Sequence, residues 1–218
     1  MSPEKKEQQK LKKMKLFISS ARDIIEEEGF ENLSIRRIAE KAGFHNSTIY
    51  FYFSDADLLI ALASVRSFAE YSRELADLSR QPGTDYDAFF RIWYFFCRQA
   101  FDKPNLFHQF FFGKYRDNLT DILNHYYEMF PEEKLEYSQA IEEMYYAPNF
   151  RERCLSILRP LQNMPDTRID EKNLDMANDI IIYTFQGLLE KKRSDPAADA
   201  DTLTARFTDM LHLLVDAR

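Results

Sequence analysis

Apolar residues recur every three or four positions along most of the chain, which is the spacing of one face of an α-helix. No stretch alternates apolar and polar residues convincingly, so we expect an all-α protein without a β-sheet. In the first quarter of the chain the pattern predicts three helices, over residues 3–28, 34–42 and 46–53. Acidic residues at 26–28 oppose the dipole of the first helix, so we expect that end to fray. Its inner stripe should consist of Leu11, Met14, Ile18, Ala21 and Ile25.

A tight turn joins the second and third predicted helices, because Gly43 allows the backbone to leave a helix abruptly. A helix lying in a DNA major groove needs hydrogen-bonding and apolar groups, and no charge that repels phosphate. The alternative is a plain three-helix unit packed for stability, which explains the apolar positions but not an acid-free outer face. The outer face of the third helix carries short polar or flat side chains and no acid, namely Asn46, Ser47, Thr48, Phe51 and Tyr52.

Residues 10 to 62 resemble the DNA-binding end of the TetR-like (tetracycline-repressor) family of bacterial transcriptional regulators. The resemblance implies a three-helix helix-turn-helix DNA-binding domain over residues 1–54 and a larger helical ligand-binding and dimerisation domain over residues 55–218. The features that carry it agree in order and spacing, which makes the motif more specific than a bare helix-turn-helix pattern. They are the apolar helix before Gly29-Phe30, the run Leu33-Ser-Ile-Arg-Arg-Ile-Ala, Lys41-Ala-Gly, Ser47-Thr-Ile-Tyr-Phe-Tyr-Phe, and Asp57-Leu-Leu.

The resemblance also implies which residues contact DNA. Arg36 matches a position that often reaches a base or phosphate, and Arg37 is the weaker candidate. The expected DNA-binding residues are Arg36, Asn46, Ser47, Thr48, Tyr50, Phe51 and Tyr52. The resemblance implies that the hydroxyls of Thr48, Tyr50 and Tyr52 hold phosphates.

Three departures from the family pattern stand out. His45 replaces the usual serine cap, so Asn46 is a candidate cap instead. Phe51 replaces a common histidine; its ring can touch thymine methyl groups or, alternatively, pack against the first helix. The run at 54–57 lacks the usual lysine, and we expect weaker nonspecific DNA affinity, offset by a lysine-rich N-terminus (Lys5, Lys6, Lys10, Lys12, Lys13 and Lys15).

Beyond residue 54 the pattern predicts further helices. A capping-box pattern at Ser54 and Asp57 should start the first of them, and Pro104 should interrupt the aromatic-rich part. Loops are expected at 81–84 and 163–167. The predicted helices span residues 54–78, 85–103, 106–112, 116–130, 131–148, 151–159, 174–188 and 203–214.

The aromatic-rich region is expected to surround a ligand cavity, as it does in the family. Bulky rings with a few polar tips suit a small apolar or flat aromatic effector. A well-filled core with no cavity is the alternative. The candidate ligand residues are Trp93, Tyr94, Phe107, Phe111, Tyr115, Tyr126 and Tyr183.

The last two predicted helices have wide apolar faces, and in the family such helices form a four-helix dimer interface. We therefore expect a homodimer that binds a palindromic double-stranded DNA operator as a repressor and is released by a small-molecule effector. An effector-free DNA-binding protein and a helical carrier of small molecules that has lost DNA binding are the alternatives.

Charge and composition restrict the other classes of protein to which the chain could belong. The net charge is −7, yet residues 1–53 hold ten Lys/Arg against eight Asp/Glu, so the acidic remainder argues against a second nucleic-acid surface.

The chain starts without a secretory signal, and its longest apolar run, Ile92 to Cys97, is too short for a membrane span, so we expect a cytoplasmic protein with no membrane partner. Its two cysteines are more typical of buried structural thiols than of a redox switch. There is no glycine-rich phosphate loop, CxxC pair or HExxH motif, and the four histidines are scattered, so we expect no cofactor, no metal site and no enzyme.

Overall fold

The computed structural model describes residues 2–78, 81–137 and 139–217 of the chain. Over these residues it consists of α-helices, short 3-10 helices and connecting loops. In the same residues the only β-type pairing is an isolated antiparallel bridge between Thr167 and Asp216. The prediction of an all-α protein is therefore confirmed.

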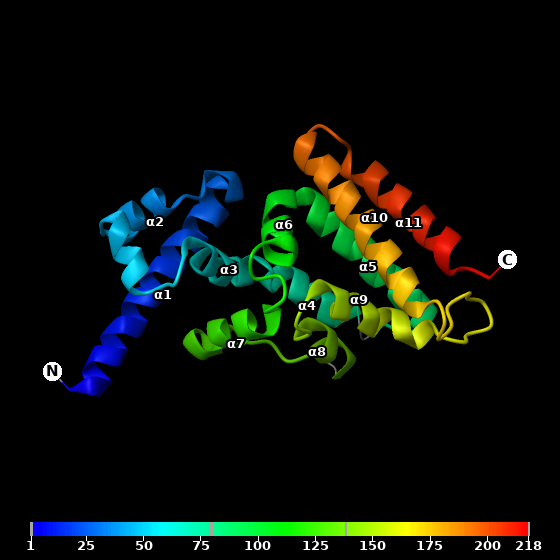
Figure 1. The fold of residues 1–218 in the computed structure, drawn as a ribbon, viewed down its shortest axis with the longest axis horizontal. Helices are drawn as coiled ribbons and strands as arrows, with labels where there is room; N and C mark the ends of the chain where they lie inside the picture. Colours follow the sequence, from blue (N-terminus) through cyan, green and yellow to red (C-terminus); the bar gives the residue numbers. More distant parts are fainter. Residues whose placement is uncertain (1, 79–80, 138, 218) are drawn as a thin grey trace.

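The helices at the two ends of the chain lie at opposite ends of the molecule (Figure 1). The long helix α1 and the short helix α2 lie at one end of the molecule, while α10 and α11 lie side by side at the far end and pack against each other and α5. In chain order the α-helices are α1 (Pro3–Glu28), α2 (Ile35–Ala42), α3 (Ala56–Ser67), α4 (Ala69–Leu78), α5 (Asp85–Asp102), α6 (Pro104–Phe112), α7 (Leu119–Met129), α8 (Gln139–Tyr145), α9 (Phe150–Leu158), α10 (Leu174–Ser194) and α11 (Ala200–Val215). The 3-10 helices are η1 (Phe30–Asn32), η2 (Asn46–Phe51), η3 (Pro131–Glu133) and η4 (Arg159–Leu161).

The first helix has the predicted bounds, and Met14, Ile18 and Ala21 of the predicted stripe are buried, but the buried face is wider than predicted. Phe17 is fully buried at its centre, with its ring centroid 5.3 Å from that of Phe44 and 6.3 Å from that of Phe53. Ile24 is also buried, whereas Leu11 is 40% exposed. The sequence missed this because α1 packs against α3 as well as α2, which widens the buried face and turns its centre toward Phe17.

The third predicted helix is a 3-10 helix, η2, rather than an α-helix. His45 caps it, since its Nδ1 accepts a hydrogen bond from the Ser47 backbone N–H at 3.4 Å and lies 2.8 Å from the Ser47 Oγ. The expectation that Asn46 caps this helix is therefore wrong.

The helix predicted over residues 54–78 is two helices, α3 and α4, separated at Phe68. Phe68 has φ −90° and ψ 0°, and its buried ring lies 4.6 Å from Phe110 and 5.0 Å from Phe107 between ring centroids. Packing of this one ring against α6 therefore coincides with the break. Asp55 rather than Ser54 caps α3, because the Asp55 carboxylate accepts a hydrogen bond from the Leu58 backbone N–H at 2.9 Å.

The second half of the chain follows the predicted pattern with two corrections. Helix α7 begins at Leu119 rather than residue 116. The single helix predicted over residues 131–148 does not form, because η3 ends where Lys134 adopts an extended backbone with φ −69° and ψ 128°, and helix resumes only at Gln139. The bounds of α6, α9 and α11 agree with the predictions to within three residues, whereas α10 continues from the predicted end at residue 188 to Ser194.

Candidate DNA-binding surface and ligand region

The acid-free face lies on η2 and is open to solvent. Phe51 is 80% exposed and Tyr50 is 57% exposed. Asn46 and Ser47 are exposed, and Thr48 is half-buried on the same short helix. The alternative role for Phe51, packing against the first helix, does not fit its exposure.

Tyr52 takes a different position from the other candidate DNA-binding residues. Its half-buried ring lies 5.8 Å from Phe17 between centroids, and the Lys13 ammonium lies 5.7 Å from the Tyr52 ring centroid. The ring therefore helps to hold η2 against α1, which the sequence did not predict.

Arg36 projects from α2 with 80% of its side chain exposed. Its Nε donates to the Glu40 carboxylate at 2.8 Å, one turn further along the helix, and this hydrogen bond raises the pKa of Arg36. An ion pair this exposed to water is worth little. Arg36 can therefore exchange Glu40 for a phosphate or a base edge at small cost.

Arg37 and Lys41 instead join α2 to the acidic end of α1. Arg37 pairs with the Glu28 carboxylate and donates to the Asn32 backbone oxygen at 3.1 Å. Lys41 Nζ lies 2.6 Å from the Glu27 carboxylate. The expected fraying of this helix end is wrong, because bases on a neighbouring helix neutralise the acids, and an argument from the dipole of α1 alone does not include them.

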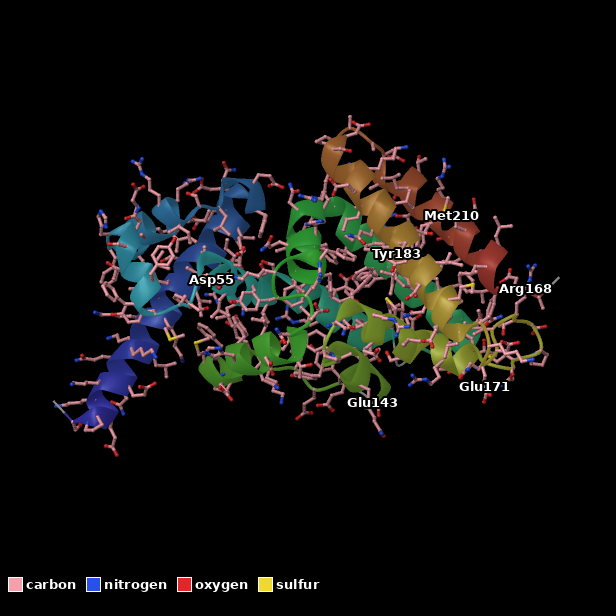
Figure 2. The ribbon with its side chains drawn as sticks, in the orientation of Figure 1. Asp55, Glu143, Arg168, Glu171, Tyr183 and Met210 are labelled. Atoms are coloured by element: carbon pink, nitrogen blue, oxygen red, sulfur yellow. The ribbon has the colours of Figure 1, made fainter. Side chains whose placement is uncertain are left out.

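Asp55 connects this DNA-binding end to the rest of the molecule (Figure 2). Besides capping α3, its carboxylate accepts hydrogen bonds from Lys114 Nζ and from the Tyr115 hydroxyl, both at 2.8 Å. Partial burial works to raise the pKa of Asp55, but the bonds from Lys114, the Leu58 amide and Tyr115 outweigh it and lower that pKa to about 2. The sequence showed only that residues 54–57 lack a base; the base that Asp55 meets lies in the connection between α6 and α7.

Three of the candidate ligand residues, Trp93, Phe107 and Phe111, meet in one buried aromatic cluster. Phe96 lies among them, with its ring centroid 5.4 to 5.7 Å from theirs. The cavity beside Trp93 and Phe96 has a volume of only about 20 Å³. In this conformation the rings therefore nearly fill the core.

The other four candidate ligand residues lie elsewhere. Tyr94 and Tyr183 are 48% and 69% exposed on the outer faces of α5 and α10, so the expectation that they line an interior cavity is not met. Both are aromatic residues within a helix, and the apolar pattern does not indicate that their faces turn outward. Tyr115 lies beside the start of α3, and Tyr126 is buried with its hydroxyl donating to Glu133. Burial and that hydrogen bond raise the pKa of Tyr126, which keeps the phenol protonated as a donor.

Exposed apolar side chains gather on the outer face of α10. Met176, Ile180 and Tyr183 follow helical spacing and are 66%, 44% and 69% exposed. Leu213 of α11 is 73% exposed. Figure 2 labels Tyr183 and Met210 on these two adjoining helices.

The two cysteines are buried free thiols. Burial raises the pKa of both Cys97 and Cys154. A thiol that stays protonated reacts poorly, so the burial favours a structural role over a redox switch.

Within the described ranges, no group of three or more His, Cys, Asp or Glu side chains is arranged to hold a metal ion. Nor does the described part of the chain contain a helix long and apolar enough to cross a membrane.

Taken together, an exposed acid-free helix at a tight turn and a separate, larger set of packed helices define a helix-turn-helix DNA-binding protein with a second helical region. Residues 17–62 match the family model described as bacterial regulatory proteins, tetR family. A search of curated protein sequences gave no match.

Solved structures extend the likeness to more than nine-tenths of the chain. A structure of RolR in complex with resorcinol has a TM-score of 0.57 and 19% identity, and the match covers 93% of this chain and 89% of that one. FadR of Thermus thermophilus, a TetR-family repressor solved with lauroyl-CoA, has a TM-score of 0.53 and 13% identity over 91% of this chain and 92% of that one. SmeT, the repressor of the Stenotrophomonas maltophilia multidrug efflux pump SmeDEF, has a TM-score of 0.52 and 12% identity. That match covers 94% of this chain and 90% of the SmeT chain.

At these identities the structures establish the fold, and the family model establishes the DNA-binding end. The chain is a TetR-like transcriptional regulator. Regulators of this family are DNA-binding transcription factors rather than enzymes.

Proposed function

We propose that this protein is a homodimeric, ligand-responsive repressor that binds a palindromic DNA operator through residues 1–54. The observation that carries the proposal is the exposed, acid-free surface of η2 within the segment that matches the tetR family. A flat aromatic ring that is 80% exposed, as Phe51 is, has no stabilising role in the isolated chain. It suits contact with thymine methyl groups in a major groove.

The remaining contacts are divided between phosphate and base. Tyr50, Thr48 and Ser47 supply hydroxyls that can donate to phosphate oxygens, and Asn46 supplies an amide that can read a base edge. Arg36 reaches the same side once it releases Glu40. Arg37 is left out, because its guanidinium already holds α2 to α1.

Nonspecific attraction to DNA must come from α1. Lys114, which lies beside the start of α3, is held by Asp55. By contrast, the lysines that follow residue 4 on α1 are exposed or half-buried. Their contacts with phosphate would weaken as salt is raised.

The dimer forms through α10 and α11. Met176, Ile180 and Tyr183 leave a stripe of apolar surface open on α10, and Leu213 adds to it from α11. Gly187 continues the stripe one turn beyond Tyr183 and has no atom within 4 Å of the place a Cβ would occupy, which lets a partner helix approach closely. A twofold dimer would place two reading surfaces on the two halves of a palindrome.

Ligand control acts through residues 55–218. RolR and T. thermophilus FadR were solved with resorcinol and lauroyl-CoA, so this fold accommodates aromatic and acyl ligands in other proteins. Here the ligand would bind in the aromatic region around Phe96 and favour an arrangement in which the two reading surfaces no longer match the operator. The effector-free alternative rests on the nearly full core, and a screen for ligand-induced rises in melting temperature separates the two.

Selection of binding sites from random duplex DNA at low salt tests the proposal. An enriched inverted repeat is the expected result. A folded dimer that enriches no sequence contradicts the proposal and favours the carrier of small molecules.

A further inference from the structure

An arginine lies buried beside the aromatic cluster. Arg153 of α9 is only 5% exposed, and its guanidinium carbon lies 5.2 Å from the Phe111 ring centroid and 5.3 Å from that of Tyr145. Nη1 donates to the Tyr145 backbone oxygen at 2.7 Å, and the Tyr71 hydroxyl is a further hydrogen-bond partner. Among the described residues no carboxylate pairs with it. A buried guanidinium normally has an anionic partner, because taking the charge out of water is costly.

A second buried donor lines the same cavity. The indole of Trp93 is 2% exposed, and its Nε1 has no hydrogen-bond partner. The other described residues lining the cavity carry no carboxylate: Tyr71, Ile92, Phe96, Met144, Phe150, Cys154 and Ile157. The cavity therefore offers charged and neutral donors inside apolar walls and lacks an anionic acceptor.

We propose that this cavity receives the carboxylate of a small apolar acid. The carboxylate pairs with Arg153 and accepts a hydrogen bond from Trp93 Nε1, while the surrounding rings and aliphatic side chains hold the apolar body. This inference rests on the proposed ligand control and narrows the effector to a monocarboxylate with an aromatic or aliphatic body.

A larger hollow adjoins the cavity and gives the apolar body a place. It has a volume of about 180 Å³ and shares Ile92 and Ile157 with the cavity wall. Its lining is apolar at Phe89, Ile141 and Pro160 and becomes charged at Asp85 and Arg91. The inner cavity, at about 20 Å³, holds little more than one water. Entry of a ligand therefore requires side chains to move, and the flexible Met144 in the wall is suited to do so.

The test compares acids with their neutral amides. A panel of unbranched alkanoates of six to twelve carbons and phenylalkanoates of two to four chain carbons is titrated into the wild-type protein, each beside its primary amide. Trp93 is the only tryptophan of the chain, so its fluorescence, excited at 295 nm, reports on this cavity alone. At least one acid is expected to change that fluorescence and to bind at least about tenfold more tightly than its amide.

Arg153→Met should remove this preference while the protein keeps its cooperative unfolding, since methionine fills similar apolar space. Arg151→Met is the matched control, because Arg151 pairs with Asp175 and Asp179 on the outside of the same helix and should leave the preference unchanged. Trp93→Phe removes only the second donor and should weaken the binding of acids more than the binding of amides. Because this variant lacks the tryptophan, its binding is measured by calorimetry.

Two results would overturn the inference: no acid in the panel binds more tightly than its amide, or the preference survives Arg153→Met. If Arg153→Met fails to fold, Trp93→Phe decides instead: a preference for acids over amides that is unchanged in this variant overturns the inference. Selection of DNA sites with the same wild-type preparation separates this inference from the proposed function. An enriched operator without an acid preference refutes the carboxylate site alone.

Discussion

The bond network at Asp55 can be tested by a substitution that removes its charge and keeps its cap. Asp55→Asn leaves a side-chain oxygen to accept the Leu58 N–H, since asparagine caps helices about as well as aspartate. The same change removes the negative charge that faces Lys114 and Tyr115. Any loss of stability then measures the connection between the DNA-binding end and the α6–α7 region rather than the start of α3.

The size of the effect follows from the pKa of Asp55, which falls from an ordinary 3.8 to about 2. A shift of that size corresponds to at most about 2.5 kcal/mol of stability at neutral pH. The side chain of Lys114 is 54% exposed, so solvent screening reduces the figure, and we expect about 1 kcal/mol.

The pH dependence has a definite sign. Because folding lowers the pKa of Asp55, its contribution is fully present above pH 4 and is lost as the pH falls toward 2. Urea unfolding of the wild type and Asp55→Asn should therefore show a gap in the free energy of unfolding at pH 7 that narrows at pH 3. Lys114→Met should lower stability by a similar amount, and the double variant should add little to either. Equal stability at pH 7, or a gap that stays constant down to pH 3, would refute the reasoning.

Three further predictions concern the two proposed interfaces. Arg36→Ala should weaken operator binding by about 1 kcal/mol or more in fluorescence anisotropy with an unchanged melting temperature, whereas Arg37→Ala should lower the melting temperature because it unties α2 from α1. The opposite pattern would exchange their roles. Tyr50→Phe keeps the ring and removes a hydroxyl, so it should weaken binding by about 1 kcal/mol for all DNA sequences alike; unchanged affinity would remove Tyr50 from the contact set. Tyr183→Asp should convert the dimer to a folded monomer in sedimentation equilibrium, and an unaltered mass would place the interface elsewhere.

Local chemistry allowed the sequence to predict most of the helix ends. Ser34 caps α2 by accepting the Arg37 N–H at 3.3 Å, and Gly43 ends the same helix with φ 77°, as both residue types suggest. The break at Phe68 could not be predicted, because it coincides with ring contacts to α6, forty residues away in the chain. Contacts of that range leave no periodic trace in the segment itself.

The exposure of the acid-free face was easier to predict than the surroundings of the aromatic residues, for a physical reason. The residue types of a helix face indicate whether it is exposed and whether it carries acids, so the absence of acids around Phe51 could be recognised from the sequence. Aromatic residues of a core and of a pocket look alike, and Tyr94 was therefore grouped with Trp93 although it faces outward. Arg153 was missed because an arginine in a helix is ordinarily an exposed residue, and nothing in its neighbours shows that it is buried.

Two copies of this surface are proposed to read one operator. To test this directly, the affinity of the wild-type protein is measured for the selected inverted repeat and for the same repeat lengthened by five base pairs between its halves. Five base pairs turn the second half-site by about half a helical turn, away from the second reading surface. Affinity for the lengthened repeat should therefore fall at least about tenfold. Equal affinity for the two duplexes would contradict the proposal, because a dimer held by α10 and α11 has a fixed distance between its reading surfaces.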